Sequence, residues 1–271
     1  MENTTKNLIK DISKEIQNAR RILFITGAGI SADSGLPTYR GIAGLYNNDK
    51  LTEENLRIED CLSYEIFAKK PEITWKYLIQ IADNCSKAKP NIAHKFIADL
   101  QKNTQKEVFV LTQNIDNLHR LAGLDENHLI EIHGNFQKLH CCNPTCNWQN
   151  NFDLYAYLDN FHNTKVLDLP KCPKCYGIAR VPVVLYGEML PENALNKLVN
   201  ELNSGFDLII VIGTSCSFPY IYQPVMQAAR NNIPTVEINP EQNTTISSVV
   251  KYHLQLGAQA AFEEINKNFA F

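Results

Sequence analysis

The sequence lacks several features that define whole classes of protein. It has no run of about 18 apolar residues, so we expect no membrane-spanning segment. Its first 21 residues alternate charged and apolar side chains without an apolar core of about 7–15 residues, which is not the pattern of a secretory signal peptide. Neither sign of charge dominates, because 26 Lys and Arg face 29 Asp and Glu for a net charge of −3. We therefore expect neither membrane association nor direct nucleic-acid binding.

Internal repeats and low-complexity linkers are also missing from the sequence. The chain has 271 residues, of which 44% are hydrophobic and 20% are charged. This is the balance of an ordinary globular protein, and it excludes a disordered or fibrous chain. The length predicts one large domain, or one domain with a smaller companion.

Short apolar runs alternate with segments of helical periodicity. The runs at residues 22–25, 108–111, 208–212 and 235–238 predict buried strands, and residues 3–20, 93–101 and 222–230 predict helices. Such alternation is typical of an α/β fold with a parallel sheet. Residues 42–82 and 137–180 break this rhythm, so we interpret them as excursions from the sheet.

The sequence has eight cysteines, and five of them fall within 35 residues. Cys172 and Cys175 are separated by two residues, and Cys146 forms a second pair with either Cys141 or Cys142. Four thiolates at such spacings suit tetrahedral Zn²⁺, and a filled Cys₄ shell leaves no position for water, so the predicted role is structural. The clustering favours a metal site in a reducing compartment over a secreted disulfide scaffold, and we expect a cytoplasmic protein.

A glycine-rich turn follows the first predicted strand. Gly27, Gly29 and Ala32 form a G-x-G-x-x-A pattern, in which the glycines permit a tight turn and a close approach to a pyrophosphate. Residues 34–37 read Ser-Gly-Leu-Pro, which must interrupt the long helix that usually follows. No acidic residue closes a second strand about 20 residues later, so a hydride-transferring dehydrogenase is the weakest enzymatic interpretation.

A third group of polar residues follows the second predicted strand. Gln113, Asn114 and Asp116 stand where ligands collect in an open α/β sheet, and their side chains can bind ribose hydroxyls or a carboxamide. His133 lies further along, and an imidazole can accept a proton near neutral pH. A lone histidine before a glycine also fits a hydrogen-bonded core residue, which is how we interpret the remaining histidines.

These motifs, in this order, resemble the sirtuin (Sir2) family of NAD-dependent protein-lysine deacylases. The matching blocks are GAGISADSGLPTYRG (27–41), TQNIDNLHRLAG (112–123), EIHG (131–134), the four-cysteine site, VPVVLYGEMLP (181–191), GTS (213–215) and INPE (238–241). The resemblance implies a Rossmann-like parallel sheet with helices on both faces, formed by residues 1–41, 84–136 and 181–271. It also implies a small lobe made of a helical insertion (42–83) and a zinc ribbon (137–180), with NAD and an acyl-lysine peptide entering between the two lobes.

The resemblance also implies roles for individual residues. His133 would be the general base, and Asn114 and Asp116 would join it at the nicotinamide end of NAD. The other NAD contacts would be Gly27, Ala28, Gly29, Tyr39, Arg40, Gln113, Ile115, Gly213, Thr214, Ser215, Asn239, Pro240, Glu241 and Gln259. The zinc ligands would be Cys141, Cys146, Cys172 and Cys175, with Cys141 preferred to Cys142 because it has the family's spacing from His133. The segment Val184, Leu185, Tyr186, Gly187 and Glu188 would pair with the substrate peptide as an added strand.

One departure from the family pattern bears on the acyl group. Thr38 and Tyr39 stand where the family commonly has Asp-Phe, and Thr at the first position resembles the branch that removes succinyl and malonyl groups. That branch reads the acyl carboxylate with a Tyr and an Arg three residues apart, a charge-assisted contact. The corresponding positions here are Leu78 and Ile81, which cannot compensate a buried carboxylate. We therefore expect acetyl or longer aliphatic acyl groups to be preferred.

Two alternatives come from different classes of function. A sirtuin-like mono-ADP-ribosyltransferase or NAD hydrolase would share His133 and the NAD-binding residues but would not require acyl-lysine. A zinc-ribbon binding module without catalysis would have no affinity for NAD, and replacing His133 would change nothing.

Overall fold

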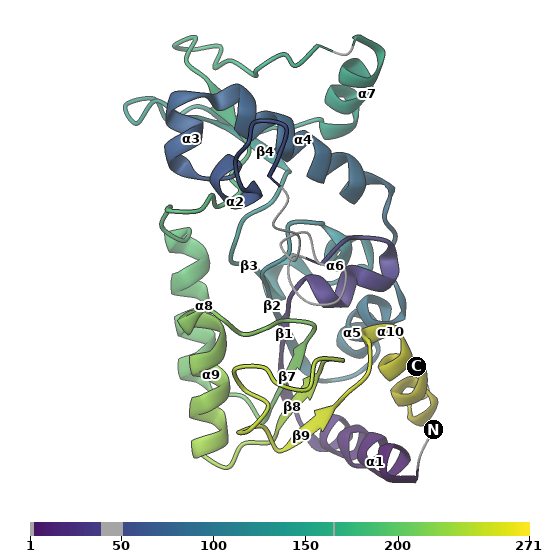
Figure 1. The fold of residues 1–271 in the computed structure, drawn as a ribbon. Coiled ribbons are helices and arrows are strands. Elements are labelled where there is room, and N and C mark those ends of the chain that lie inside the picture. Colours follow the sequence, from purple (N-terminus) through teal and green to yellow (C-terminus); the bar gives the residue numbers. More distant parts are fainter. Residues whose placement is uncertain (1–2, 39–50, 165) are drawn as a thin grey trace. The chain divides into compact units, whose positions relative to one another are not determined.

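The computed structural model describes residues 3–38, 51–164 and 166–271 (Figure 1). The chain divides into two compact units. The first is made of Met1–Asn47, Ala88–Ile132 and Glu192–Phe271, and the second of Asn48–Lys87 and His133–Pro191. Tyr39 and Arg40, which we expected to contact NAD, lie outside the described residues.

The first unit is built on a sheet of six parallel strands in the order β3-β2-β1-β7-β8-β9. Their bounds are β1 Arg21–Thr26, β2 Glu107–Thr112, β3 Leu129–Glu131, β7 Leu208–Ile212, β8 Thr235–Ile238 and β9 Tyr252–Leu254. The chain adds strands on one side of β1 and then returns to add strands on the other side. This is the strand order of dinucleotide-binding folds, and it confirms the predicted Rossmann-like sheet.

Helices cover both faces of this sheet, with α8 and α9 on one face and α1, α5 and α10 on the other (Figure 1). The helices of the first unit are α1 Asn3–Asn18, α5 Ile92–Asn103, α6 Leu118–Leu121, α8 Glu192–Ser204, α9 Pro219–Arg230 and α10 Ala258–Ile265, with 3₁₀ turns at η1 Ala28–Ser34, η2 Glu126–His128 and η3 Asn266–Asn268. Because both faces are covered, β1 is an uninterrupted apolar run from Ile22 to Ile25 and not an alternating one.

The helices α1, α5 and α10 bury their apolar faces in one core, and this burial stabilises them as helices. Ile9, Ile12 and Ile16 recur at helical spacing in α1 and belong to the same buried apolar cluster as Ile22 and Phe24 of β1. On the same face, Asn91 is the N-cap of α5. Its side-chain oxygen accepts the backbone N–H of Ala93 at 3.0 Å.

The predicted elements of the first unit agree with the structure within a few residues. The strands β3 and β9 were not predicted from the sequence. Each has only three residues and lies at an edge of the sheet, so neither is long enough to show a periodic pattern.

The second unit combines helices with a small antiparallel sheet. Its elements are α2 Ile58–Cys61, α3 Tyr64–Lys69, α4 Pro71–Lys87, α7 Leu154–Thr164 and the strands β4 Lys138–Cys141, β5 Gln149–Asn151 and β6 Ala179–Arg180 in the order β5-β4-β6. The side chain of Trp75 in α4 contacts Phe152 and Tyr157. The centroid of its ring lies 6.4 Å from that of Phe152 and 5.8 Å from that of Tyr157. The helical insertion and the ribbon therefore share one aromatic core. Among the described residues, no helix is both long and apolar enough to cross a membrane.

Candidate functional site

In the first unit, the loops that follow β1 and β7 meet where the strand order reverses. The N–H of Gly27 donates to the carbonyl of Ile212 at 3.0 Å, and the N–H of Gly29 donates to the carbonyl of Gly213 at 2.8 Å. A Cβ on Gly29 would lie 2.6 Å from Cα of Gly213, which no side-chain rotation can relieve. From the sequence we attributed these glycines to the close approach of a pyrophosphate. In the structure, the contact between the two loops already requires glycine, because there is no room for a side chain.

Asn114 and Asp116 lie beside this turn, at the end of β2, and are 6% and 7% exposed. The side-chain amide of Asn114 donates to the carbonyl of Gly27 at 3.0 Å and to Oγ of Ser31 at 3.3 Å. Oδ2 of Asp116 accepts the hydroxyl of Ser31 at 2.7 Å, and Oδ1 accepts the N–H of Leu118 at 2.9 Å. Burial raises the pKa of Asp116, and these two donors act against that rise.

Two buried histidines extend this polar group, and the sequence interpretation treated them only as core residues. Nε2 of His94 lies 3.5 Å from Oγ of Ser31, Nε2 of His119 lies 3.0 Å from Oγ1 of Thr26, and the two rings are 4.9 Å apart. Burial lowers the pKa of His94 to about 4, and it lowers the pKa of His119 well below its usual range. Both rings are therefore neutral at pH 7. Ser31 donates a hydrogen bond to Asp116, and His94 lies within hydrogen-bond distance of Ser31, so both residues belong to the site. No spacing in the sequence indicates these contacts.

A second chain of hydrogen bonds joins the ends of β2, β7 and β8. The amide of Gln113 donates to Oγ1 of Thr214 at 2.9 Å, and the amide of Asn239 donates to the carbonyl of Thr214 at 3.1 Å. Oδ1 of Asn239 in turn accepts the N–H of Glu241 at 3.1 Å. The residues that the sequence separates by more than 100 positions thus meet at one edge of the sheet.

The remaining predicted contacts of the first unit lie around these loops. Ala28, Ile115, Ser215 and Pro240 flank the residues just described, and Oγ of Ser215 lies 2.8 Å from Oγ of Ser217. Gln259 is in the first turn of α10, where its N–H donates to the carboxylate of Asp33 at 3.1 Å. An acidic side chain at a helix N-terminus is favourable, so Asp33 joins the glycine-rich turn to α10.

His133 and Gly134 belong to the second unit, where a neighbouring segment holds their backbone. The carbonyl of His133 accepts the N–H of Val184 at 2.9 Å. Gly134 has φ of +76°, and a Cβ there would lie 1.7 Å from the carbonyl oxygen of Pro182. Only glycine can follow His133 in this packing, so the sequence pair His-Gly has a steric cause.

The predicted peptide-binding segment of residues 184–188 already uses much of its backbone. Tyr186 forms a parallel bridge with Ser63, because its N–H donates to Leu62 at 2.9 Å and its carbonyl accepts the N–H of Tyr64 at 2.9 Å. The N–H of Leu185 donates to Oε2 of Glu188 at 2.9 Å. An added strand therefore finds less of this segment available than the sequence suggested.

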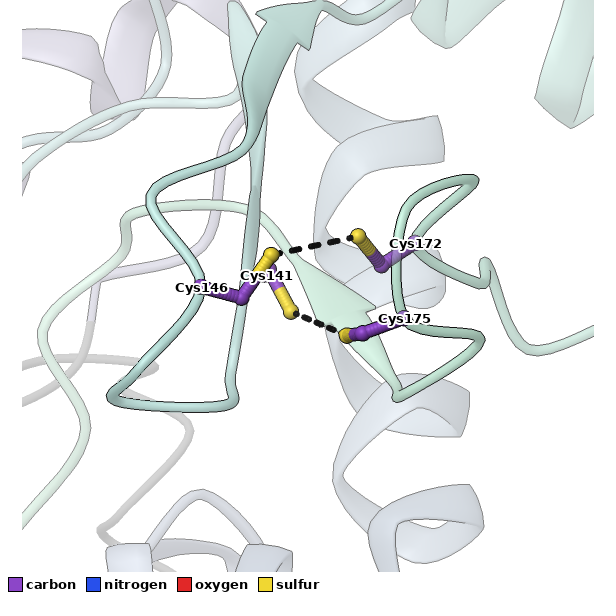
Figure 2. A group of neighbouring side chains, drawn as sticks. All are labelled: Cys141, Cys146, Cys172 and Cys175. Atoms are coloured by element: carbon purple, nitrogen blue, oxygen red, sulfur yellow. Dashed lines mark hydrogen bonds between the residues drawn. The ribbon is translucent and has the colours of Figure 1, made fainter.

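Four cysteine sulfurs gather at the ends of two hairpins in the second unit (Figure 2). The sulfurs of Cys141, Cys146, Cys172 and Cys175 all lie within 4.8 Å of one another. Sγ of Cys141 is 3.4 Å from that of Cys175, and Sγ of Cys146 is 3.7 Å from that of Cys172. Zn–S bonds of about 2.3 Å in a tetrahedron place sulfurs about 3.8 Å apart, so the group fits one zinc ion.

The neighbouring backbone suits thiolate ligands. The N–H of Asn143 lies 3.4 Å from Sγ of Cys141, and the N–H of Lys174 lies 3.4 Å from Sγ of Cys172. Such donors compensate part of the negative charge on bound sulfur. Cys142 is outside the group, and its N–H instead donates to the carbonyl of Ile178 at 2.9 Å.

Comparison with known proteins identifies the family. The model of the Sir2 family matches residues 27–218, which include the glycine-rich turn, Asn114, Asp116, His133 and the four cysteines. The chain belongs to the Sir2 family. The NAD-dependent protein deacylase 2 of Pseudomonas aeruginosa is 45% identical over 232 residues, covering 86% of each chain. The NAD-dependent protein deacylase of Thermococcus sibiricus is 37% identical and covers 87% of each chain.

Solved Sir2 structures also share the fold. A crystal structure of a Sir2 homologue in complex with NAD has a TM-score of 0.79 and 31% identity, and the match covers 96% of this chain and 93% of the other. For this Sir2-family chain, the structure brings Gly27, Asn114 and Thr214 together at one sheet edge, among the predicted NAD contacts that lie in the described residues. Within the second unit it places His133 against residues 182–184 and gathers the four cysteines.

The two predicted acyl-binding positions lie in α4, and they differ in burial. Leu78 of α4 is 1% exposed and lies in the apolar core of the second unit, whereas Ile81 is partly exposed. The cations of α4 are Lys76 and Lys87, and both are paired with acids. Nζ of Lys76 lies 2.6 Å from Glu53 and 2.7 Å from Glu54, and Nζ of Lys87 lies 2.6 Å from Asp83.

Proposed function

We propose that this Sir2-family protein removes acyl groups from protein lysines in an NAD-dependent reaction that yields nicotinamide, O-acyl-ADP-ribose and free lysine. The observation that carries the proposal is the meeting of the Gly27–Gly29 turn, Asn114 and Asp116 with Thr214 and Asn239 at the reversal point of a Rossmann-like sheet. Dinucleotides bind at this place in open α/β sheets. The P. aeruginosa and T. sibiricus relatives named as NAD-dependent deacylases support it.

The site divides the dinucleotide between two groups of residues. We assign the adenosine half to Gly213, Thr214, Ser215, Asn239, Pro240, Glu241 and Gln259. We assign the phosphates and the nicotinamide end to Gly27, Ala28, Gly29, Tyr39, Arg40, Gln113, Asn114, Ile115 and Asp116. NAD supplies the electrophilic ribose carbon, so the chain needs no Ser or Cys nucleophile. The residues of the chain bind NAD, orient it and accept a proton.

His133 is the residue that we assign to proton transfer. A neutral imidazole can take the proton of a ribose hydroxyl near neutral pH. The bond from its carbonyl to Val184 and the steric limit at Gly134 hold the backbone in place, so the ring is carried by a rigid support. We place the substrate peptide at the turn around Gly187, because the N–H groups of Val184, Leu185 and Tyr186 already donate within the unit.

The zinc site serves the fold and not the reaction. Cys141, Cys146, Cys172 and Cys175 fill four positions, so no ligand position is left for a reactive water. We therefore assign one structural Zn²⁺ to this chain, with Cys141 and not Cys142 as the first ligand.

The names of the relatives do not specify an acyl group, so the acyl preference is a separate proposal. A succinyl or malonyl group would bring a carboxylate to α4, where Lys76 and Lys87 are already paired with acids and Tyr77 donates its hydroxyl to Glu54. Leu78 is buried in the apolar core, and the partly exposed Ile81 offers apolar surface only. Since an uncompensated buried charge is costly, we propose a preference for acetyl or longer aliphatic acyl groups.

Nicotinamide release tests the function. NAD would be incubated with and without an acetyl-lysine peptide, using the wild type, His133→Ala and, as a matched control, His128→Ala at the end of the 3₁₀ turn η2. We expect release that requires both the peptide and His133 and that is normal in the control. Release without peptide would instead indicate an NAD hydrolase or an ADP-ribosyltransferase, and no release or NAD binding would indicate a zinc-ribbon binding module.

A peptide series tests the acyl preference. Acetyl, longer aliphatic and succinyl peptides of one sequence would be compared by kcat/KM. We expect the succinyl value to be the lowest, and Ile81→Arg to raise the ratio of succinyl to acetyl by about tenfold, the value of one charge-assisted contact. Gln80→Arg, on the exposed side of α4, is the control. A wild type that removes succinyl faster than acetyl would refute the preference.

A further inference from the structure

An ion pair between Arg180 and Glu188 lies in the second unit. Nη2 of Arg180 is 2.7 Å from Oε2 of Glu188, and the side chains are only 11% and 17% exposed. The carbon Cζ of Arg180 also lies 5.1 Å from the centroid of the Phe67 ring, within cation–π distance. The guanidinium is therefore held by a carboxylate and by an aromatic ring of α3.

Glu188 uses the same oxygen to close a turn. Oε2 accepts the N–H of Leu185 at 2.9 Å, while the N–H of Glu188 donates back to the carbonyl of Leu185 at 3.0 Å. Gly187, between them, has φ of +86°, a conformation that favours glycine. Leu185 is 3% exposed, so its N–H would be buried without a partner if the carboxylate moved away. The ion pair thus holds the turn of residues 185–188 in shape.

Arg180 connects this turn to the metal cluster. It lies in β6, where it pairs with His140 of β4, and the adjacent residue Ala179 pairs with Cys141. The N–H of Cys142 donates to Ile178 on the same hairpin. The strand that presents Arg180 is therefore paired directly with the strand that carries Cys141.

The pair is a poor device for stability alone. Burying an ion pair costs desolvation that its attraction barely repays, and a well-packed apolar pair often does as well. In addition, Nη1 of Arg180 is buried with no hydrogen-bond partner among the described residues. What the pair does provide is a fixed direction for the Glu188 carboxylate, and through it a fixed turn.

We propose that Arg180 and Glu188 are positioning residues for the acyl-lysine peptide. Arg180 orients the Glu188 carboxylate, the carboxylate closes the turn of residues 185–188, and the turn presents its backbone to the peptide. Because β6 is paired with the strand that carries Cys141, the metal cluster orders peptide binding through Arg180. This inference rests on the proposed deacylase function and on the placement of the peptide at this turn.

Steady-state kinetics with separate KM values for peptide and NAD test the inference. The variants are Arg180→Met, Glu188→Gln and the double variant, with Arg57→Met as the matched control. Arg57 is in the same unit and pairs with Asp60, but those side chains are 71% and 40% exposed. Each single variant should raise the peptide KM by about tenfold or more, with kcat and the NAD KM changed by less than about threefold. The double variant should add less than about twofold, because the residues act as one unit.

Zinc content of about one ion per chain shows that each variant keeps its ribbon. If Arg180→Met loses zinc, Glu188→Gln carries the test, since it leaves β6 unchanged. An unchanged peptide KM in folded Glu188→Gln, or peptide and NAD KM rising together, would overturn the inference while the wild type remains an active deacylase. A wild type without acyl-lysine-dependent nicotinamide release would overturn the proposed function itself, and this inference with it.

Discussion

The hydroxyl of Ser31 donates to Oδ2 of Asp116 across 2.7 Å, inside a site that is almost closed to solvent. The two residues are 85 positions apart in the sequence. Through Ser31, Asp116 is linked to Asn114 and to the ring of His94. A carboxylate whose pKa is raised by burial thus depends on one hydroxyl for part of its compensation.

Replacing Ser31 by Ala should weaken the nicotinamide end of the site. A hydrogen bond to a charged group contributes about 1.5–3 kcal/mol, so we expect kcat/KM for NAD to fall by roughly tenfold to a hundredfold. Ser34→Ala is the control, because among the described residues the Ser34 hydroxyl accepts one neutral bond, from the amide of Asn91 at 3.1 Å. Equal losses in the two variants would show that the bond to Asp116 has no special role.

Gly29 should tolerate no side chain. Its Cβ would meet the Gly213 backbone at 2.6 Å, so Gly29→Ala must push the two loops apart, and we expect a loss of at least about 2 kcal/mol in the free energy of unfolding together with weaker NAD binding. Gly257→Ala is the matched control, since a Cβ there meets only the Asp33 carboxylate at 3.8 Å. Urea denaturation and NAD titration measure both effects, and a fully stable Gly29→Ala variant would contradict the steric explanation.

Zinc content should distinguish the two adjacent cysteines. Cys141→Ser removes a member of the four-sulfur group, so we expect less than one zinc ion per chain and a less ordered ribbon. Cys142→Ser should keep one ion, because its sulfur is not in the group. Metal analysis after dialysis, with the circular dichroism spectrum of each variant, makes the comparison. Normal zinc in Cys141→Ser would require another ligand.

Acid should destabilise the first unit through His94. Its pKa is about 4 in the folded protein and 6.5 ordinarily, so between these values the unfolded chain binds a proton that the folded chain does not. The free energy of unfolding therefore falls as the pH drops from 6.5 towards 4, by up to about 1.4 kcal/mol per pH unit for this group. His119 acts in the same direction, while the raised pKa of Asp116 opposes it at pH values above 3.8.

The variant His94→Gln should show a shallower pH dependence than the wild type. Urea denaturation at pH 7, 6 and 5 measures it, and any acid release of zinc affects both proteins alike because the ribbon is unchanged. Identical slopes would mean that His94 takes up a proton in the folded state.

Local patterns in the sequence predicted the α/β fold, the central strands and the cysteine spacing. These features depend on neighbouring residues: a buried parallel strand must be apolar throughout, and a zinc knuckle needs two thiolates a few residues apart. The resemblance to sirtuins rested on the same local blocks. The match to the Sir2 model confirmed the family, and relatives named NAD-dependent protein deacylases support the proposed activity.

Only the tertiary structure decided which distant residues meet. The short edge strands β3 and β9, the contact of Gly29 with Gly213, the bonds of Ser31 and His94 to the Asp116 site, and the pairing of Arg180 with Glu188 all depend on packing between segments that are separate in the chain. No periodicity records such contacts, because each side chain involved is ordinary in its own sequence neighbourhood. Their chemistry comes from burial and from the partner that the fold supplies.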